Sequence, residues 1–368
     1  MADNAADNSD SPKLLMVAAP FEVRGTSAYT LRLASQLTED GVSLRIVTPD
    51  SSRIDPEKRK SLTIVSCPQL DIPLWRRVVR HFLYNDLASE VPDLIHVQSR
   101  AALATGNWLA NQFERPYVLT VHDFLASRER IRIDLAWCRQ VICVSESVRD
   151  DLQARAHLPA ELLTVIRSGV EGTDKTPDAR ILDPDHIPVI GAASPLEAVK
   201  GLQFFLGAAQ RVLATGRKVE FLIAGAGPEE GNLRRLARDL EITEHITFVP
   251  NLLDFKRSIE AMDIFCLPSI RQGLGTVMLE AMALGKPVIA TRVDGPNQIV
   301  VPSETGMVVP PSNSARMAEA MLQLLDDPER AIALGQAARQ FVSREFSVER
   351  MVRETRDCYR MAVAEHVR

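Results

Sequence analysis

The sequence has few cysteines, no long apolar run and no excess of positive charge. Its five cysteines stand singly, without Cys-x-x-Cys spacing, so we expect a reducing compartment and no disulfide framework. No apolar stretch approaches the roughly 18 residues that a transmembrane helix needs. A net charge of −5 argues against a protein that holds nucleic acid by bulk electrostatics. We therefore do not expect nucleic acid as a partner.

The amino-terminal segment, residues 1–12, is polar and acidic. It lacks the basic start and the apolar centre of a secretory signal peptide, so we expect a disordered lead. Together with the missing apolar runs, this composition predicts a soluble protein of the cytoplasm.

Two similar halves follow the lead. In each half, short apolar runs alternate with helical patterns, which is typical of a parallel sheet covered by helices on both faces. The pattern predicts one α/β domain at 13–172, a Pro- and Asp-rich linker at 173–187 and a second α/β domain at 188–345. A final helix at 346–368 is expected to pack back toward the first domain. The predicted strands are Lys13–Ala19, Ser43–Thr48, Leu62–Ser66, Asp93–Val97, Tyr117–Val121 and Gln140–Val144 in the first half, and Pro188–Ala193, Glu220–Ala224, Ile246–Val249, Ile264–Leu267 and Pro287–Ala290 in the second.

The strongest local signal for chemistry lies at Leu267–Thr291. A strand ends there, and Gly273-Leu274-Gly275 opens a helix. Glycines before a helix N-terminus let backbone N–H groups approach a phosphate, which the helix dipole also favours. Glu280 lies seven residues beyond Gly273, about two helical turns, so its carboxylate faces the loop and can accept hydrogen bonds from a ribose diol. The segment predicts a nucleoside diphosphate site; the alternative is a capped turn with a solvent-facing glutamate.

This segment resembles the donor-site signature of the retaining glycosyltransferases of the GT-B fold, family 4 (glycosyl transferases group 1). That signature has a glutamate, then Gly-Phe-Gly, a second glutamate eight positions after the first, and Ala-Met-Ala-x-Gly-Lys-Pro-Val. The resemblance implies two Rossmann-like domains whose parallel sheets face each other across a cleft, with the nucleotide sugar held between them. Further blocks resemble the family in the same order along nearly the whole chain: Asp93–His96, Thr120–Asp123, Val144–Glu146, Val165–Val170, Lys200-Gly201, Ala224–Pro228 and Thr305–Pro310.

The resemblance also implies roles for residues of the first half. Gly25 and Thr26 would belong to a loop that meets the donor diphosphate and the reacting sugar. His122, which follows the apolar strand Tyr117–Val121, would lie against the transferring sugar. Attack would come from the face that the diphosphate leaves, so the anomeric configuration would be retained.

In the second half, the resemblance implies that Lys200 neutralises the charge that grows on the leaving diphosphate. Gly275 and Thr276 would offer backbone N–H groups to the same phosphates, and Glu280 would hold the ribose. Because a lysine and helix amides take the place of a divalent cation, the family needs no metal, and no cofactor is expected besides the donor substrate.

The sequence departs from the family pattern at three site positions. The family arginine that shares the diphosphate with the lysine falls at Pro195, the first glutamate of the pair is Gln272, and a further glutamate is Gln298. Gln272 keeps the hydrogen-bonding reach of glutamate but loses the negative charge that could support an oxocarbenium-like centre. A weakened enzyme, or a non-catalytic nucleotide-sugar-binding partner of an active glycosyltransferase, is therefore the alternative to full activity.

We expect transfer of a hexose from a UDP-, GDP- or ADP-sugar to a glycan or lipid-linked acceptor. A sugar-nucleotide epimerase of the same architecture is a further alternative. The segment Leu74–Tyr84 carries apolar residues on one helical face and arginines on the other, so it could contact the inner face of a membrane peripherally; a packed helix with a solvated face explains it equally well.

Overall fold

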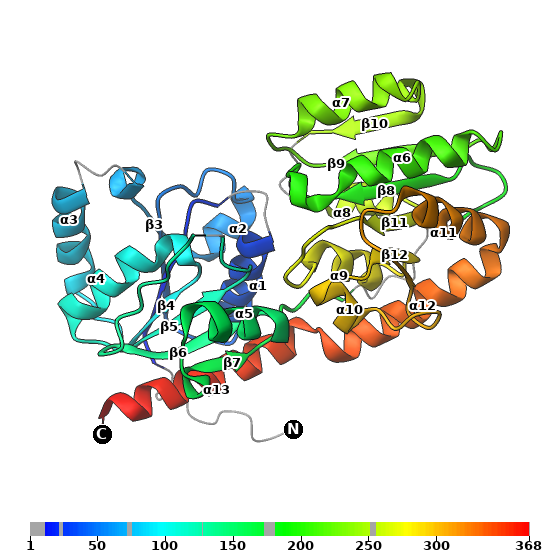
Figure 1. Cartoon of the computed structure of the whole chain (residues 1–368). Coiled ribbons are helices and arrows are strands. Elements are labelled where there is room, and N and C mark those ends of the chain that lie inside the picture. Colours follow the sequence, from blue (N-terminus) through cyan, green and yellow to red (C-terminus); the bar gives the residue numbers. More distant parts are fainter. Residues whose placement is uncertain are drawn as a thin grey trace. The chain divides into compact units, whose positions relative to one another are not determined.

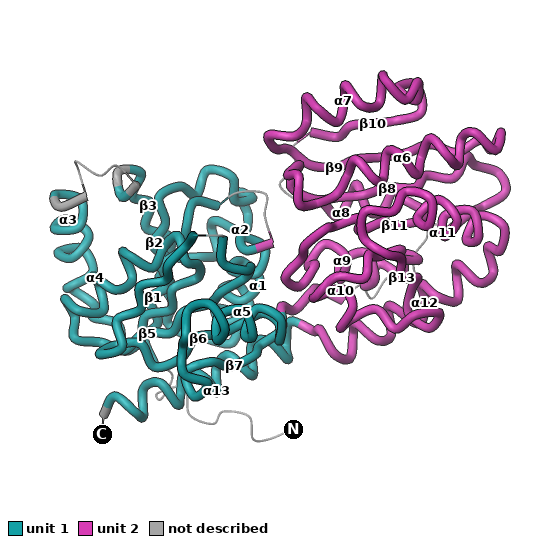
Figure 2. Tube along the Cα trace, viewed as in Figure 1, with its two compact units in different colours: residues 1–22, 26–167, 348–368 teal, residues 23–25, 168–347 magenta. Residues whose placement is uncertain are grey.

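The computed structural model describes residues 12–21, 25–71, 76–126, 128–172, 181–250 and 255–367. By their contacts, residues 1–22, 26–167 and 348–368 form a first compact unit, and residues 23–25 and 168–347 form a second (Figure 2). Most of the predicted linker, residues 173–180, lies outside the described residues, as does nearly all of the expected disordered lead.

The first unit is a seven-stranded parallel sheet with helices on both faces (Figure 1). Its inner strands Leu14–Val17, Leu94–Val97 and Tyr117–Val121 are buried along their whole length, because helices cover both faces of the sheet there. The strand order is β3 (Thr63–Ser66), β2 (Leu44–Thr48), β1 (Leu14–Val17), β4 (Leu94–Val97), β5 (Tyr117–Val121), β6 (Cys138–Cys143) and β7 (Leu163–Val165). The helices are α1 (Gly25–Glu39), α2 (Pro56–Ser61), α3 (Arg76–Ala88), α4 (Leu103–Phe113), α5 (Glu146–Ala156) and α13 (Val348–Val367), with short 3₁₀ turns at Pro68–Asp71, Arg100–Ala102 and Ala160–Leu162.

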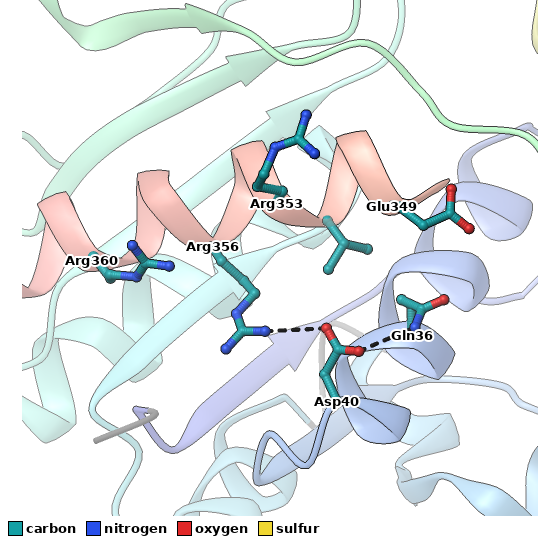
Figure 3. A pocket seen from close by; sticks show the side chains of 7 residues that line it. Gln36, Asp40, Glu349, Arg353, Arg356 and Arg360 are labelled. Atoms are coloured by element: carbon teal, nitrogen blue, oxygen red, sulfur yellow. Dashed lines mark hydrogen bonds and ion pairs between the residues drawn. The ribbon is translucent and has the colours of Figure 1, made fainter. Parts of the chain in front are cut away.

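The last helix, α13, belongs to the first unit although it is the carboxyl-terminal element of the chain. Its apolar side chains share one core with α1 and with one face of the sheet. Tyr359 of α13 also binds the ring of the buried His96, with 2.6 Å between the hydroxyl and Nδ1. At the solvent edge, the Arg356 guanidinium donates to the Asp40 carboxylate at 3.2 Å (Figure 3). This ion pair lies in an open hollow of about 290 Å³ lined by Gln36, Asp40, Glu349, Val352, Arg353, Arg356 and Arg360.

The second unit is a six-stranded parallel sheet, again between helices. The helices α6 and α11 pack together and enclose most of one core with the sheet. The strand order is β10 (Ile246–Val249), β9 (Glu220–Ala224), β8 (Val189–Ala193), β11 (Ile264–Leu267), β12 (Val288–Thr291) and β13 (Met307–Val309). The helices are α6 (Leu202–Leu213), α7 (Glu230–Asp239), α8 (Lys256–Glu260), α9 (Thr276–Ala283), α10 (Asp294–Ile299), α11 (Ser314–Asp326) and α12 (Pro328–Glu345), with 3₁₀ turns at Ala198–Lys200 and Thr243–His245.

Both sheets are doubly wound, as the alternating sequence pattern predicts. Each strand that the apolar runs predict is present, whereas the three-residue edge strands β7 and β13 are too short to give such a run. In the first sheet the chain winds from β1 to β3 and then crosses to β4; in the second it winds from β8 to β10 and then crosses to β11. Two strands flank each crossing, and the loops that follow them diverge. Doubly wound sheets bind ligands in the crevice between these loops, at the carboxyl ends of the strands. These crossings therefore locate one candidate site in each unit.

Candidate functional site

The candidate site of the second unit is built from the loops that follow β8 and β11. The first loop ends in the 3₁₀ turn Ala198–Lys200, and the second runs from Pro268 to Gly275, where α9 begins. The two loops are joined directly, because the Ile270 N–H donates to the Val199 carbonyl at 2.9 Å. Residues that are far apart in the sequence are thus brought together at the crossing of the sheet.

Gly201 makes this close approach of the two loops possible. Its φ of +66° lies in the left-handed region, and a Cβ atom built on it would lie 2.1 Å from the Pro268 carbonyl oxygen. A side chain at this position would meet main chain, which cannot rotate away as a flexible side chain can. The residue next to it, Lys200, is therefore held against the end of β11.

The side chain of Lys200 binds that of Gln272, with 3.0 Å between Nζ and Oε1. The buried hydroxyl of Ser269 donates to the same Oε1 atom at 3.1 Å. Within the described part of the chain, the Lys200 ammonium has no carboxylate partner. The Gln272 amide oxygen is the side-chain acceptor that it contacts there. Lys200 and Gln272, both predicted as site residues, are adjacent. Ser269 was missed, because a serine after a strand is common.

The glycine turn before α9 ends at Gly275, as the sequence predicts from Gly273-Leu274-Gly275 opening a helix. Gly275 has a φ of +89° and is the residue before the helix. The first backbone N–H groups of a helix have no acceptor within it and point out of its N-terminal end. Among the described residues, the N–H groups of Gly275 and Thr276 have no hydrogen-bond partner. A second glycine is needed nearby: a Cβ atom on Gly295 would lie 1.8 Å from the Gly273 carbonyl oxygen. The buried Leu274 side chain helps to anchor the turn.

The remaining predicted residues of this unit lie on or beside the same loops. Glu280 is half-buried in the second turn of α9. Gln298 lies on the exposed side of α10. Pro195 lies just after β8, and its carbonyl accepts hydrogen bonds from the Ser194 hydroxyl and the Glu197 N–H. Position 195 therefore supplies no cation to the site.

In the first unit, His122 lies directly after β5. Its Nε2 atom is 2.9 Å from the Gln98 carbonyl oxygen, and since a carbonyl can only accept, Nε2 carries the proton and Nδ1 is free to accept. The Tyr29 ring packs against the imidazole in a T-shaped arrangement, with the centroids 4.9 Å apart. Burial lowers the pKa of His122 to about 4, against a smaller opposing effect of the Gln98 bond. The imidazole is therefore neutral at physiological pH.

Gln98 itself is a site candidate that the sequence analysis missed. It follows β4 at the crossing of the first sheet, and its side chain is fully buried. The Thr30 hydroxyl contacts Gln98 Oε1 at 3.2 Å and the Thr26 carbonyl at 3.0 Å, which links Gln98 to the first turn of α1. That turn contains the predicted residues Gly25 and Thr26, while residues 22–24 lie outside the described ranges. A polar residue immediately after a buried strand was the available signal.

Sequence comparison assigns both halves of the chain to known families. The profile of "Glycosyltransferase Family 4" matches residues 23–172, and that of "Glycosyl transferases group 1" matches residues 178–341. The D-inositol 3-phosphate glycosyltransferase of Pseudarthrobacter chlorophenolicus is 32% identical over 389 residues, covering 93% of this chain and 91% of the relative. Other relatives match over about half of their length. One is the GDP-mannose-dependent monoacylated alpha-(1-6)-phosphatidylinositol monomannoside mannosyltransferase of Corynebacterium glutamicum, which is 38% identical over 45% of each chain.

Structural comparison identifies the fold. The crystal structure of Anabaena Alr3699/HepE in complex with UDP and glucose superimposes with a TM-score of 0.81, covering 95% of this chain and 99% of that chain at 18% identity. At this identity the likeness concerns the fold. The chain therefore belongs to the family 4 glycosyltransferases (glycosyl transferases group 1) and has the GT-B fold.

Proposed function

We propose that this protein transfers a hexose from a nucleoside diphosphate sugar, with UDP, GDP or ADP as the nucleotide, to a glycan or lipid-linked acceptor. Membership of the family supports a transferase. One relative is named as a GDP-mannose-dependent mannosyltransferase that acts on a phosphatidylinositol mannoside, and one structural neighbour holds UDP and glucose. These names support a nucleotide sugar as donor and leave its base open.

The observation that carries the proposal is the set of donors on Lys200 and at the start of α9 that remain available to a ligand. The ammonium has no carboxylate partner within the described residues, and the N–H groups of Gly275 and Thr276 are likewise unbonded there. A phosphate group accepts hydrogen bonds and brings negative charge, so it fits such a set of donors at a helix N-terminus. In the proposal, Glu280 on the same helix accepts from the ribose diol.

The same groups suit the transition state of glycosyl transfer. When the bond between the sugar and the diphosphate breaks, negative charge grows on the leaving phosphate, and Lys200 with the α9 amides stabilises it there. This takes the place of a divalent cation, so we propose a metal-independent reaction. His122, neutral and with Nδ1 free to accept, receives a hydrogen bond from a sugar hydroxyl. Retention of the anomeric configuration follows the resemblance to the retaining enzymes.

Nucleotide binding is the first test. Thermal shift and calorimetry with UDP, GDP and ADP should show one of them raising the melting temperature of the native protein. Lys200→Ala should weaken that nucleotide about tenfold or more, because it removes a charge-assisted bond. Lys218→Ala is the matched control, since Lys218 is an exposed lysine in the turn before β9, at the opposite ends of the strands. If none of the three nucleotides binds the native protein, the proposal is wrong.

Turnover separates the enzyme from a non-catalytic binding partner. Over a panel of donors and acceptors, we expect release of the nucleoside diphosphate together with a glycosylated product, both lost in Lys200→Ala and unaffected by EDTA. NMR of the product tests whether the anomeric configuration is retained. Binding without any turnover would favour the non-catalytic partner, and an isomerised sugar formed without acceptor would indicate an epimerase.

We also propose that α3 contacts a membrane surface through its exposed apolar face. Phe82 and Val78, one turn apart, are 67% and 47% exposed, and arginines stand in the same helix. Residues 74 and 75 of the predicted segment lie outside the described residues, and no described helix has the length and apolarity to cross a bilayer. Phe82→Ser should reduce binding to anionic vesicles, whereas Leu135→Ser, which alters another exposed apolar residue of the same unit, should not. Equal binding of both variants would refute this contact.

A further inference from the structure

The partner of Lys200 is neutral, so the ammonium keeps its positive charge toward a ligand. A carboxylate 3.0 Å from the ammonium would cancel most of its charge toward a ligand, whereas the Gln272 amide oxygen orients the ammonium and leaves its charge in place. Of the three ammonium hydrogens, one is used by Gln272, so two remain for a ligand.

The orientation of the Gln272 amide is itself determined. Its Oε1 atom accepts from both Lys200 Nζ and Ser269 Oγ, at 3.0 and 3.1 Å. An amide NH₂ group cannot accept, so these two donors identify the oxygen. Ser269 is fully buried, and its own carbonyl accepts from the Thr291 hydroxyl at 2.6 Å, which anchors it at the end of β11. The Gln272 NH₂ group, without a partner among the described residues, is left to donate as well.

Two of the sequence departures balance in charge. Proline stands at position 195, where the family pattern has an arginine, so one positive charge is missing from the loop after β8. Glutamine stands at position 272, where the pattern has a glutamate, so one negative charge is missing from the loop after β11. The two changes cancel, so the net charge of these two hydrogen-bonded loops is the same as in the family pattern. Of the two cations that the family pattern places at this site, Lys200 is the one that this sequence keeps.

We propose that Ser269 and Gln272 together hold Lys200 as a positioned cation whose charge is not neutralised, and that this arrangement selects the terminal phosphate of a nucleoside diphosphate. The inference rests on the proposed function and specifies how its site recognises the substrate. Lys200 and the Gln272 NH₂ group present donors only, so an oxygen-rich anion is the ligand they suit. Ser269 is a positioning residue, because it acts on Lys200 only through the Gln272 amide.

The decisive variant is Gln272→Glu, which keeps the shape of the side chain and its bond to Ser269 but pairs Lys200 with a carboxylate. Dissociation constants for UDP, GDP and ADP and for the corresponding monophosphates are measured by calorimetry on the full chain, after thermal melts have shown that the variant folds. We expect the diphosphate that binds the native protein to bind about tenfold more weakly, while its monophosphate is nearly unaffected.

The role of Ser269 is tested by a double-mutant cycle. Ser269→Ala should weaken diphosphate binding about threefold, the effect of one neutral hydrogen bond, and should have no effect in the Lys200→Ala background. A structural role would instead weaken binding equally in both backgrounds, and that result would refute the positioning role.

Failure of this inference and failure of the proposed function give different results. If Gln272→Glu binds the diphosphate as tightly as the native protein while Lys200→Ala does not, the charge argument is wrong and the nucleotide site stands. An equal loss for diphosphate and monophosphate would also overturn the selectivity. If the native protein binds no nucleotide, it is the proposed function that falls.

Discussion

Gly201 offers a direct test of how the second unit builds its site, through the substitution Gly201→Ala. A Cβ atom there would lie 2.1 Å from the Pro268 carbonyl oxygen, whereas real Cβ contacts are essentially never below 3.0 Å. One of the two loops must therefore move by about 1 Å. The left-handed φ of +66° adds about 1 kcal/mol for any residue with a Cβ atom. Strain in a packed region adds about 1–3 kcal/mol more, so we expect a total loss of about 2–4 kcal/mol.

Gly216→Ala is the matched control. Gly216 also has a left-handed φ, of +79°, but a Cβ atom there would have no heavy atom within 4 Å. Its substitution should therefore cost only the backbone part, about 1 kcal/mol. The difference between the two variants isolates the close approach of the loops after β8 and β11.

Urea unfolding followed by far-UV circular dichroism measures this difference. Tryptophan fluorescence alone would not, because Trp75, Trp108 and Trp137 all belong to the sequence of the first unit. Nucleotide affinity gives a second readout: a shift of about 1 Å next to Lys200 should weaken diphosphate binding about tenfold in Gly201→Ala and leave Gly216→Ala unchanged. Equal stability losses in the two variants, with equal affinities, would refute the reasoning.

Three further predictions concern stability. Asp263, buried before β11, accepts hydrogen bonds from the Leu182 and Val189 N–H groups and from His186 Nε2, so Asp263→Ala should cost about 3 kcal/mol in urea unfolding; a loss below 1 kcal/mol would contradict this. Burial lowers the pKa of His96 from 6.5 to about 3, so only the unfolded chain binds this proton between those values. Stability should therefore be complete above pH 6.5 and fall as the pH drops toward 3, by up to about 1.4 kcal/mol per pH unit, a slope that His96→Gln should flatten in unfolding followed by tryptophan fluorescence. The ion pair between Arg356 and Asp40 is about one third exposed on each side, so Asp40→Asn should cost less than about 1 kcal/mol in the same assay; a larger loss would mean that the pair does more than join two surfaces.

Much of the architecture could be predicted from the sequence because its causes are local. Apolar runs of four to six residues separated by helical patterns are what a covered parallel sheet requires, and they predict every strand except the short edges β7 and β13. The turn at Gly273–Gly275 is likewise a local matter, since a left-handed residue before a helix favours glycine. Lys200 was predicted through its family context, because a lone lysine before a glycine has no local signature of its own.

Contacts across the chain had to come from the tertiary structure. The sequence does not show that Lys200 meets Gln272 seventy-two positions later, or that Ser269 fixes the same amide oxygen. It gives no reason why position 201 must be glycine, and it does not show Gln98 buried beside His122. Each of these depends on which strands become neighbours in the sheet. Strand order is chosen by the packing of the whole unit, and no single segment carries that information.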